Sequence, residues 1–335
     1  MKPRSCTGLV LVVFFATRAP IVFSQQDSSF RSAFHFYWDN DFINLRMHGS
    51  DEAYTNGMKL EYLETIPRNP RFFLNRFFIR AGNNAINTSS WSVMQVMYSP
   101  SDIRRQIPDS TDYPYSGGLF TTHFVHSTDS KQKFSLQTGI TLGVMGPPSL
   151  AGPTQVAVHR AIKNLEPKGW DYQLKKDFLF NLSFTAEKML RQYGRAFELI
   201  GGANAQAGTM FNALTAYFLI RAGKMNPYFN GLIGQVNTMK HSKKFYVNVV
   251  ASPSAQVVFY NSLVDGGLLR RWAGRELAPT KRRTLSMTEF NLGINYGFTV
   301  AWKRVGVAIL QQMLIPTTID LPDHEVGNVT LSLAF

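Results

Sequence analysis

The chain ends in Asn328-Val329-Thr330-Leu331-Ser332-Leu333-Ala334-Phe335, a stretch in which polar and apolar side chains alternate almost one by one. A β-strand places successive side chains on opposite faces, so this stretch predicts a strand with one apolar and one polar face. The same alternation runs through residues 133–144, 178–187 and 289–299, where large apolar side chains oppose Asn, Ser, Thr and Gly. The fold is therefore predicted to consist of long amphipathic strands.

Amphipathic strands of about ten residues are typical of transmembrane β-barrels. A soluble β-sandwich also alternates, but its polar face rarely carries so many Gly and Asn residues opposite Phe. Terminal Phe335 favours the barrel, because an amphipathic strand that ends in Phe resembles the insertion signal of bacterial outer-membrane proteins. We therefore predict an all-β fold, a twelve-stranded antiparallel transmembrane β-barrel with a short helix in an extracellular loop.

Twelve candidate strands are an even number, as single-chain bacterial barrels require. They lie near residues 32–41, 54–64, 89–99, 116–127, 133–144, 178–188, 195–207, 209–221, 245–261, 286–300, 304–315 and 326–335. The pattern is least regular at 195–207 and 245–261. With both termini in the periplasm, the links at 42–53, 100–115, 145–177 and 262–285 are expected to be extracellular. The long apolar link at 65–88 is then periplasmic, and we interpret it as an amphipathic segment at the inner interface.

Residues 1–24 are predicted to be a secretory signal peptide, with a basic start, an apolar stretch and a small residue near Ser24. Residues 25–335 then form one barrel domain. The single cysteine, Cys6, lies in the signal peptide, so the exported chain is expected to lack disulfide and thiolate chemistry. Export and the barrel pattern together predict a protein of the bacterial outer membrane.

The net charge is +13, and it falls to +10 when the three basic residues of the signal peptide are removed. A basic exported protein is expected to meet anionic lipid rather than nucleic acid. An external loop is especially basic, and its cations can bind lipid phosphates or merely stabilise the protein in lipopolysaccharide. They are Arg270, Arg271, Arg275, Lys281, Arg282 and Arg283.

The extracellular link at 145–177 interrupts the alternation with Gly and Pro, and then predicts a helix that Thr154 caps and that ends before Pro167. Gln155 and His159 are four residues apart, so they lie on one side of this helix. A polar residue beside an imidazole is a candidate reaction site, although a surface helix with an idle histidine explains the same spacing.

A second group of polar residues lies at the extracellular ends of the first two strands. Asp39 and Asp41 are expected to turn inward, and the top of the first strand brings Asp41 near Thr55. Carboxylate, hydroxyl, amide and carbonyl oxygens are hard ligands that suit Ca²⁺ better than zinc. Ordinary turn formation by Asn and Asp is the alternative interpretation.

Several motifs together resemble the outer-membrane lipid A 3′-O-deacylases, and the resemblance covers nearly the whole exported chain. The motifs are Asn40-Asp41, Tyr54-Thr55-Asn56-Gly57, Tyr98-Ser99-Pro100-Ser101, Gly143-Val-Met-Gly-Pro with Gln155-x-x-x-His159, and Gly169-Trp170-Asp171-x-Gln173. The resemblance implies a twelve-stranded, Ca²⁺-dependent hydrolase that acts on lipid A in lipopolysaccharide. It also implies that His159 is the general base and that Asn40 and Gln155 are active-site residues.

The same resemblance implies Asp41 and Thr55 as residues of the metal site. Two positions depart from the family pattern. Arg105 stands where the family has lysine, so the positive charge is kept with a different geometry. Leu165 occupies the position of the family's acidic residue after the histidine, and Glu166 follows by one, which leaves Glu166 as the candidate for that metal ligand.

The chemistry expected is ester hydrolysis by water that His159 activates, because no Gly-x-Ser-x-Gly motif follows the signal peptide. Ser149 is the nearest hydroxyl that could instead form an acyl-enzyme. The function predicted is a monomeric Ca²⁺-dependent lipid A esterase. An outer-membrane phospholipase with a serine nucleophile and a non-catalytic barrel or porin are the alternatives.

Overall fold

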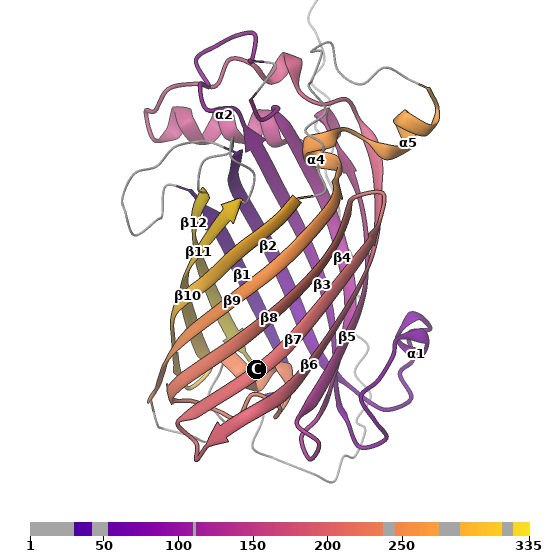
Figure 1. Cartoon of the computed structure of the whole chain (residues 1–335), viewed down its shortest axis with the longest axis vertical. Helices are drawn as coiled ribbons and strands as arrows, with labels where there is room; N and C mark the ends of the chain where they lie inside the picture. The colour runs from indigo at the N-terminus through magenta and orange to yellow at the C-terminus, as the bar shows by residue number, and fades with distance from the viewer. Residues whose placement is uncertain (1–29, 42–52, 110–111, 237–244, 275–288, 317–323) are drawn as a thin grey trace, which may run out of the picture.

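Twelve antiparallel strands close into a barrel, in which each strand pairs with its neighbours in the chain and the last strand pairs with the first (Figure 1). The structure is a computed structural model, and it describes residues 30–41, 53–109, 112–236, 245–274, 289–316 and 324–335. The predicted signal peptide therefore lies outside the described residues. The predicted fold class is confirmed.

All twelve predicted segments are strands. They are β1 (Ser32–Asn40), β2 (Ala53–Ile66), β3 (Ile86–Ser99), β4 (Ser116–Asp129), β5 (Phe134–Met145), β6 (Asp177–Tyr193), β7 (Phe197–Gly208), β8 (Phe211–Lys224), β9 (Phe245–Asn261), β10 (Glu289–Trp302), β11 (Val305–Pro316) and β12 (His324–Ala334). The pattern of β9 is blurred by Pro253, which lacks a backbone N–H. Pro253 pairs with Ile294 of β10, and the ladder to β8 is interrupted at this place.

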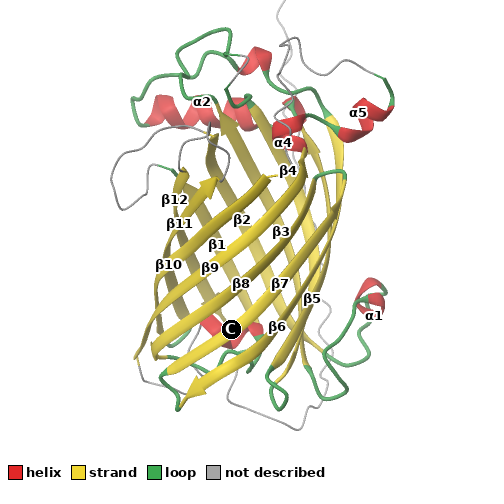
Figure 2. Ribbon diagram, viewed as in Figure 1, coloured by secondary structure: helices red, strands yellow, loops and turns green. Residues whose placement is uncertain are grey.

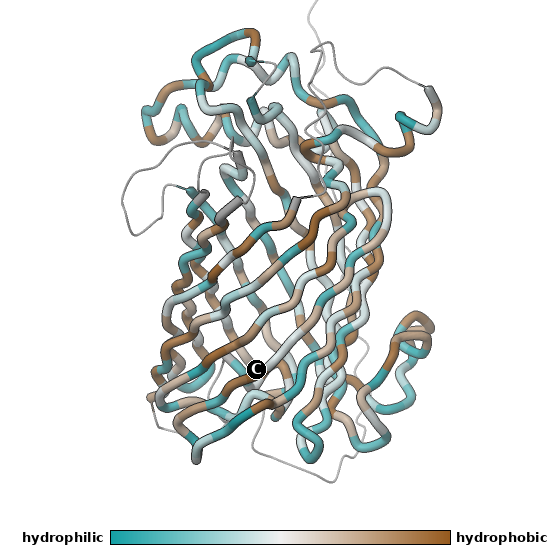
Figure 3. The backbone as a smooth tube through the Cα atoms, in the orientation of Figure 1, coloured by the Kyte–Doolittle hydropathy of each residue, from teal (hydrophilic) through white to brown (hydrophobic). Residues whose placement is uncertain are grey.

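The alternation in the sequence becomes an apolar outer wall and a polar interior. Phe34, Leu60 and Val93 are exposed on the outside, whereas Asp39 and Glu61, at positions of the opposite parity, are buried. In Figure 3 hydrophobic and hydrophilic residues alternate along the strands. A barrel with this pattern can lie in a membrane because neighbouring strands satisfy one another's backbone hydrogen-bonding groups.

The links between strands are unequal at the two ends of the barrel (Figure 2). One end carries η1 (Pro147–Ser149), α2 (Ala151–Ala161), η2 (Trp170–Tyr172), α4 (Ser262–Asp265) and α5 (Leu268–Trp272). The other end carries α1 (Leu74–Phe77) and α3 (Leu232–Val236). The long link before β3 thus lies at the end opposite α2, as strand parity predicts. In the described ranges, no helix is long and apolar enough to cross a membrane.

Residues 225–236, which follow β8, fold into the lumen at its periplasmic end (Figure 1). Ile233 of α3 is buried in one apolar cluster with Ala33, Leu63 and Ala334, which lie on the inner faces of β1, β2 and β12. On the other side of the lumen, the backbone N–H of Tyr228 donates to Glu198 of β7 at 3.3 Å. We call residues 225–236 the plug.

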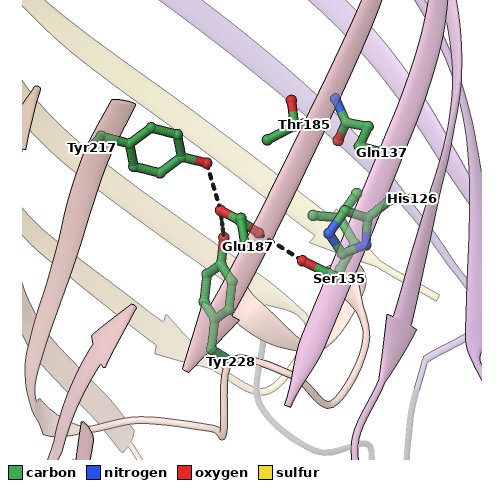
Figure 4. Close-up of a pocket in the computed structure, with 8 residues that line it drawn as sticks. His126, Ser135, Gln137, Thr185, Glu187, Tyr217 and Tyr228 are labelled. Carbon is green, nitrogen blue, oxygen red and sulfur yellow. Dashed lines mark hydrogen bonds between the residues drawn. The ribbon is translucent and has the colours of Figure 1, made fainter. Parts of the chain in front are cut away.

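A cavity of about 220 Å³ lies in the lumen beside the plug (Figure 4). Its central group is Glu187, which accepts hydrogen bonds of 2.8 Å from the hydroxyls of Ser135, Tyr217 and Tyr228. Since Tyr228 belongs to the plug and Glu187 to β6, this buried carboxylate ties the plug to the wall. Three donors around one carboxylate also compensate its burial.

A buried ion pair makes the second attachment of the plug and leads to a prediction about stability. Arg221 of β8 contacts Glu198 at 2.8 Å, with side chains only 5% and 2% exposed, and it also donates to the Asn226 carbonyl at 3.3 Å. Arg221→Met leaves Glu198 as an uncompensated buried charge. We expect unfolding to become easier by about 3–5 kcal/mol, measured by urea titration in detergent micelles. Arg304→Met, in an exposed turn, is the control, and equal stability of the two variants would contradict the assigned role.

Candidate functional site

Helix α2 begins three residues before the predicted cap. Its first residue is Ala151, and the preceding Leu150 has a left-handed backbone with φ of 60°. Thr154 lies inside the helix, where its hydroxyl donates to the Leu150 carbonyl at 2.9 Å. The predicted cap was wrong because Pro153 was interpreted as a breaker, although proline is tolerated in the first turn of a helix.

Helix α2 packs against the outer wall of the barrel rather than over its mouth. Trp91 and Val93 of β3 are exposed on the outside, and Met97 and Ser99 of the same parity are buried. Met97 forms an apolar cluster with Ala151, the first residue of α2. Beside them, a Cβ added to Gly117 of β4 would lie 2.2 Å from the Ala151 Cβ. The glycine therefore allows the helix to approach the strands closely.

Gln155 fastens the middle of α2 to β3. Its Nε2 donates to the Ser99 hydroxyl at 3.0 Å, and its Oε1 accepts from the Trp170 indole at 2.7 Å. Trp170 packs on Tyr115 with ring centroids 5.0 Å apart. Since Gln155 and Ser99 are buried, these bonds are made away from water and hold the helix in one position.

The buried residues of α2 form one stripe, with Ala151, Gln155 and His159 four residues apart. Ala151 lies against β4 and Gln155 against β3, so the helix crosses the strands in the direction of β2. His159 is one turn beyond Gln155, about 6 Å along the axis, which compares with about 4.8 Å between neighbouring strands. The stripe therefore leads His159 towards the extracellular ends of β2 and β1.

His159 is 5% exposed as a residue, and its Nδ1 lies 2.5 Å from the carbonyl oxygen of Leu165. A carbonyl can only accept, so Nδ1 carries the proton in this contact. In the neutral ring, Nε2 is then the basic nitrogen. The main chain at Leu165, which stands where the family pattern has an acidic residue, thus orients the histidine.

Glu166 points away from this contact. Its carboxylate forms a two-pronged ion pair with Arg160, with Nε–Oε1 at 2.7 Å and Nη2–Oε2 at 2.9 Å. Both side chains are exposed, and the hydrogen bonds from Arg160 lower the pKa of the Glu166 carboxyl. To bind a metal ion, the Glu166 carboxylate would have to release the Arg160 guanidinium.

Asp41 and Thr55 lie together at the same end of the barrel. The backbone N–H of Asp41 donates to the Thr55 carbonyl at 3.3 Å, and both residues are buried. Thr55 is the extra residue of a β-bulge. Tyr54 pairs with Tyr98 and Asn56 pairs with Met97, so no residue of β3 remains opposite Thr55. A bulge redirects side chains and is frequent beside active sites.

Asp39, which was also expected to turn inward, is bonded on both carboxylate oxygens. Its Oδ2 accepts from the Tyr54 hydroxyl at 3.0 Å, and its Oδ1 accepts from the Asn328 amide at 2.9 Å. These bonds lie inside the barrel and join β1, β2 and β12. Asp39 is thus a structural carboxylate of the interior.

The donor set at Asp41 fits a hard cation. A buried carboxylate, the hydroxyl of Thr55 and a main-chain carbonyl are oxygen donors of the kind that Ca²⁺ binds. In the described part of the chain, no three His, Cys, Asp or Glu side chains gather into a group that could hold a metal ion. A cation here would therefore depend mainly on hydroxyl, amide and carbonyl oxygens, with Asp41 as its charged ligand.

Asn40 and Arg105 complete the predicted residues. Asn40 is half-buried at the end of β1 and pairs with Asn56 of β2. Asn56 in turn pairs with Met97 of β3, which α2 covers. Arg105 lies in the link between β3 and β4, where its exposed side chain approaches Asp102 at 3.6 Å and Asp109 at 3.5 Å. Exposed ion pairs are weak, so Arg105 can exchange these partners for an anionic ligand.

The sequence did not reveal the roles of Ser99, Trp170 and Gly117. Ser99 and Trp170 belong to motifs of the family resemblance, but no pattern indicates that both bind Gln155. Gly117 and Gly118 form a Gly-Gly pair after Ser116. A glycine inside a strand can indicate the close approach of another chain segment. In the basic loop, Arg270 and Arg271 belong to α5 at the extracellular end, and Arg275, Lys281, Arg282 and Arg283 lie outside the described residues.

The comparisons with known proteins agree with this architecture. A family model described as outer membrane protein LpxR matches residues 9–335. The structure of LpxR from Salmonella typhimurium has a TM-score of 0.70 and 17% sequence identity, and the match covers 90% of this chain and 100% of that chain. The β domain of the Bordetella autotransporter BrkA is less similar, with a TM-score of 0.46, 7% identity, and coverage of 91% and 99%. No curated protein matches the chain.

Proposed function

Since the chain belongs to the LpxR family of outer-membrane lipid A 3′-O-deacylases, we propose that it removes 3′-linked acyl chains from lipid A in a Ca²⁺-dependent ester hydrolysis. One observation supports this proposal most strongly. The buried stripe of α2 directs His159, with its Nδ1 held by the Leu165 carbonyl, towards the strand ends that carry Asp41 and Thr55.

The hydrolysis needs a base for water and positive charge where the ester oxygen becomes negative. Nε2 of His159 accepts a proton from water while the water oxygen bonds to the acyl carbon. The imidazolium then returns the proton to the departing sugar oxygen, which leaves a free fatty acid and a sugar hydroxyl. The Asn40 amide and the Arg105 guanidinium can stabilise the negative charge.

Asp41 and Thr55 would hold Ca²⁺, with Glu166 as a further ligand only if it leaves Arg160. When bound, the ion supplies a Lewis acid that polarises the ester carbonyl. Gln155 acts differently, because its hydrogen bonds to Ser99 and Trp170 engage its amide. We assign it the role of a positioning residue that fixes α2 and thereby His159.

The position of α2 also supports a lipid substrate. The helix lies on the outer face of β3 and β4, so the space beside it opens towards the outer leaflet and not into the lumen. Acyl chains can stay among the lipids while the headgroup reaches His159. The phosphates of lipid A can be bound by Arg270 and Arg271 of α5, which lies at the same end.

Mass spectrometry of lipid A from cells that express the protein tests the proposal. We expect the mass of one 3′-linked acyl group to be lost, and we expect chelation of divalent cations to prevent this loss. Phospholipids from the same cells should be unchanged. Unaltered lipid A beside accumulating lysophospholipids would favour the phospholipase.

The porin alternative predicts ion conductance. The plug enters the periplasmic end of the lumen and Tyr228 of the plug bonds to Glu187 of the wall, so we expect the wild type to be closed in planar bilayers. Steady conductance together with unaltered lipid A would contradict the enzyme.

Ser149, the nearest hydroxyl that could instead form an acyl-enzyme, leads to a third test. It is fully buried, and its hydroxyl donates to the Gly146 carbonyl at 2.6 Å. A buried hydroxyl with this bond is poorly suited to attack an ester. Ser149→Ala should keep deacylation within about ten-fold of the wild type, whereas removal of a nucleophile costs several orders of magnitude. A loss of that size in a folded barrel would establish an acyl-enzyme.

A further inference from the structure

The link between β2 and β3 has an unusual composition for a periplasmic turn. Residues 67–85, which we call the arm, contain four arginines and no Asp, Glu or Lys. The arginines are interleaved with large apolar side chains, in the order Arg68, Arg71, Phe72, Phe73, Arg76, Phe77, Phe78, Ile79 and Arg80. The arm is thus both strongly cationic and strongly apolar.

The arm is anchored to the outside of the barrel. Asn75 of α1 is buried and contacts Nε2 of His123 through its Oδ1 at 2.7 Å. His123 is the register partner of outward-facing Trp91 and stacks on it with centroids 4.2 Å apart. The backbone N–H of Ala81 adds a bond of 2.9 Å to the Ser127 hydroxyl. Figure 1 shows α1 beside the lower part of the barrel wall, outside the lumen.

The height of the arm on the wall follows from a row of aromatic rings. Phe335 contacts Phe34 at 5.6 Å, and Phe34 contacts Tyr62 at 5.1 Å. Tyr62 is the register partner of Trp91, and Trp91 contacts Phe72 of the arm at 5.6 Å. Rows of outward aromatic side chains mark the membrane–water interface of transmembrane barrels. Phe72 therefore places the arm at the periplasmic interface of the outer membrane.

Apolar side chains of the arm remain exposed at this height. Phe77 is 77% exposed, Phe73 is 59% exposed and Ile79 is 54% exposed. The exposure of such a cluster to water is unfavourable, and the free energy is lowered if the side chains enter the lipid. The arm thus has the apolar part of an interfacial anchor.

The arginines supply the cationic part. Arg68 donates to the side-chain oxygen of Asn83 at 3.0 Å, Arg76 to the Pro70 carbonyl at 3.1 Å, and Arg80 to the Asn75 carbonyl at 3.1 Å. All of these acceptors are uncharged. The hydrogen bonds therefore orient the guanidinium groups without neutralising their positive charge. Guanidinium groups bind phosphodiesters through several hydrogen bonds at once.

We propose that the arm binds anionic phospholipid of the periplasmic leaflet, with its phenylalanines among the acyl chains and its arginines on the headgroup phosphates. Lipopolysaccharide is not its ligand, because the arm lies at the end of the barrel opposite α2. The arm fastens the barrel to the inner leaflet, independently of any reaction at His159. Each basic residue near an anionic lipid surface contributes about a five-fold factor in affinity.

Lipid titration with native mass spectrometry tests the proposal on the whole protein in detergent. The variant is Arg68→Gln/Arg71→Gln/Arg76→Gln/Arg80→Gln. The control, Lys131→Gln/Lys133→Gln/Arg195→Gln/Arg304→Gln, removes equal charge from other periplasmic turns. We expect the arm variant to bind phosphatidylglycerol roughly 600-fold more weakly, as four five-fold factors imply, and the control to stay within about five-fold. Equal losses in both, or an unchanged arm variant, would overturn the proposal.

The depth of the arm is a second, independent readout. Phe77→Cys in a Cys6→Ser background gives one site for a spin label in vesicles of phosphatidylcholine and phosphatidylglycerol. We expect the label to collide with oxygen more often than with a water-soluble nickel complex. A label that meets only the nickel complex lies in water, and the arm would then be no membrane anchor.

Discussion

His159→Ala is expected to abolish deacylation of lipid A in a barrel that folds normally. A positioned general base contributes about 10²–10⁴-fold to a rate, so the variant should lose at least two orders of magnitude. The alanine removes the proton acceptor at Nε2 but leaves Gln155 to hold α2 on β3 through Ser99 and Trp170. The measurement is the time course of 3′-acyl loss from purified lipid A in mixed micelles, by mass spectrometry.

The control for this variant is His126→Gln. His126 is also a buried histidine, but it lines the lumenal cavity beside the plug. Its substitution should leave the rate unchanged within a few-fold. Both variants should migrate as folded barrels on unheated gels. Full activity of the His159 variant would refute the assignment of the base, because no reorganisation of α2 can restore a missing imidazole.

Asp41→Asn is the second variant with a large expected effect. The substitution keeps the size of the side chain and removes the one charge of the proposed cation site. A metal that polarises the carbonyl supplies several kcal/mol, so we expect a rate about 10³-fold lower at limiting Ca²⁺. Raising the Ca²⁺ concentration should recover part of the activity, because Thr55 and the main-chain oxygens remain.

Asp39→Asn is the matched control, at a residue two positions earlier in the chain, near the end of β1. Asp39 already accepts hydrogen bonds from Tyr54 and Asn328 inside the barrel, so its substitution should leave the Ca²⁺ dependence unchanged. If both variants shift the Ca²⁺ titration equally, the effect belongs to the strand end as a whole. If neither shifts it, the cation is bound elsewhere and Asp41 is not its ligand.

The strands were predictable because period-two alternation is a direct consequence of strand geometry. Even 245–261 was identified, although Pro253 interrupts its ladder to β8. The position of α2 was not predictable. Alternation states which residues share a face of a strand, but it does not state which outward residues a distant helix will cover. The burial of Ser99 and Met97 on the outer wall is visible only in three dimensions.

The candidate site was predictable in part for a related reason. The spacing of Gln155 and His159 correctly places both residues on one side of a helix, and the structure shows that this side is buried. Their partners lie in separate segments, since Ser99 is in β3, Trp170 follows the helix, and the contact at Leu165 uses a main-chain oxygen. A carbonyl carries no side-chain signature, so the sequence could show that an acid is missing at Leu165 but not what orients the ring.

The plug between β8 and β9 has a consequence for the cell that carries this barrel. An open cylinder of this size would let small hydrophilic antibiotics and nutrients diffuse across the envelope. Residues 225–236 are tied to both sides of the interior through Glu187, Glu198 and Ile233, so we expect the permeability barrier to be kept even at high copy numbers.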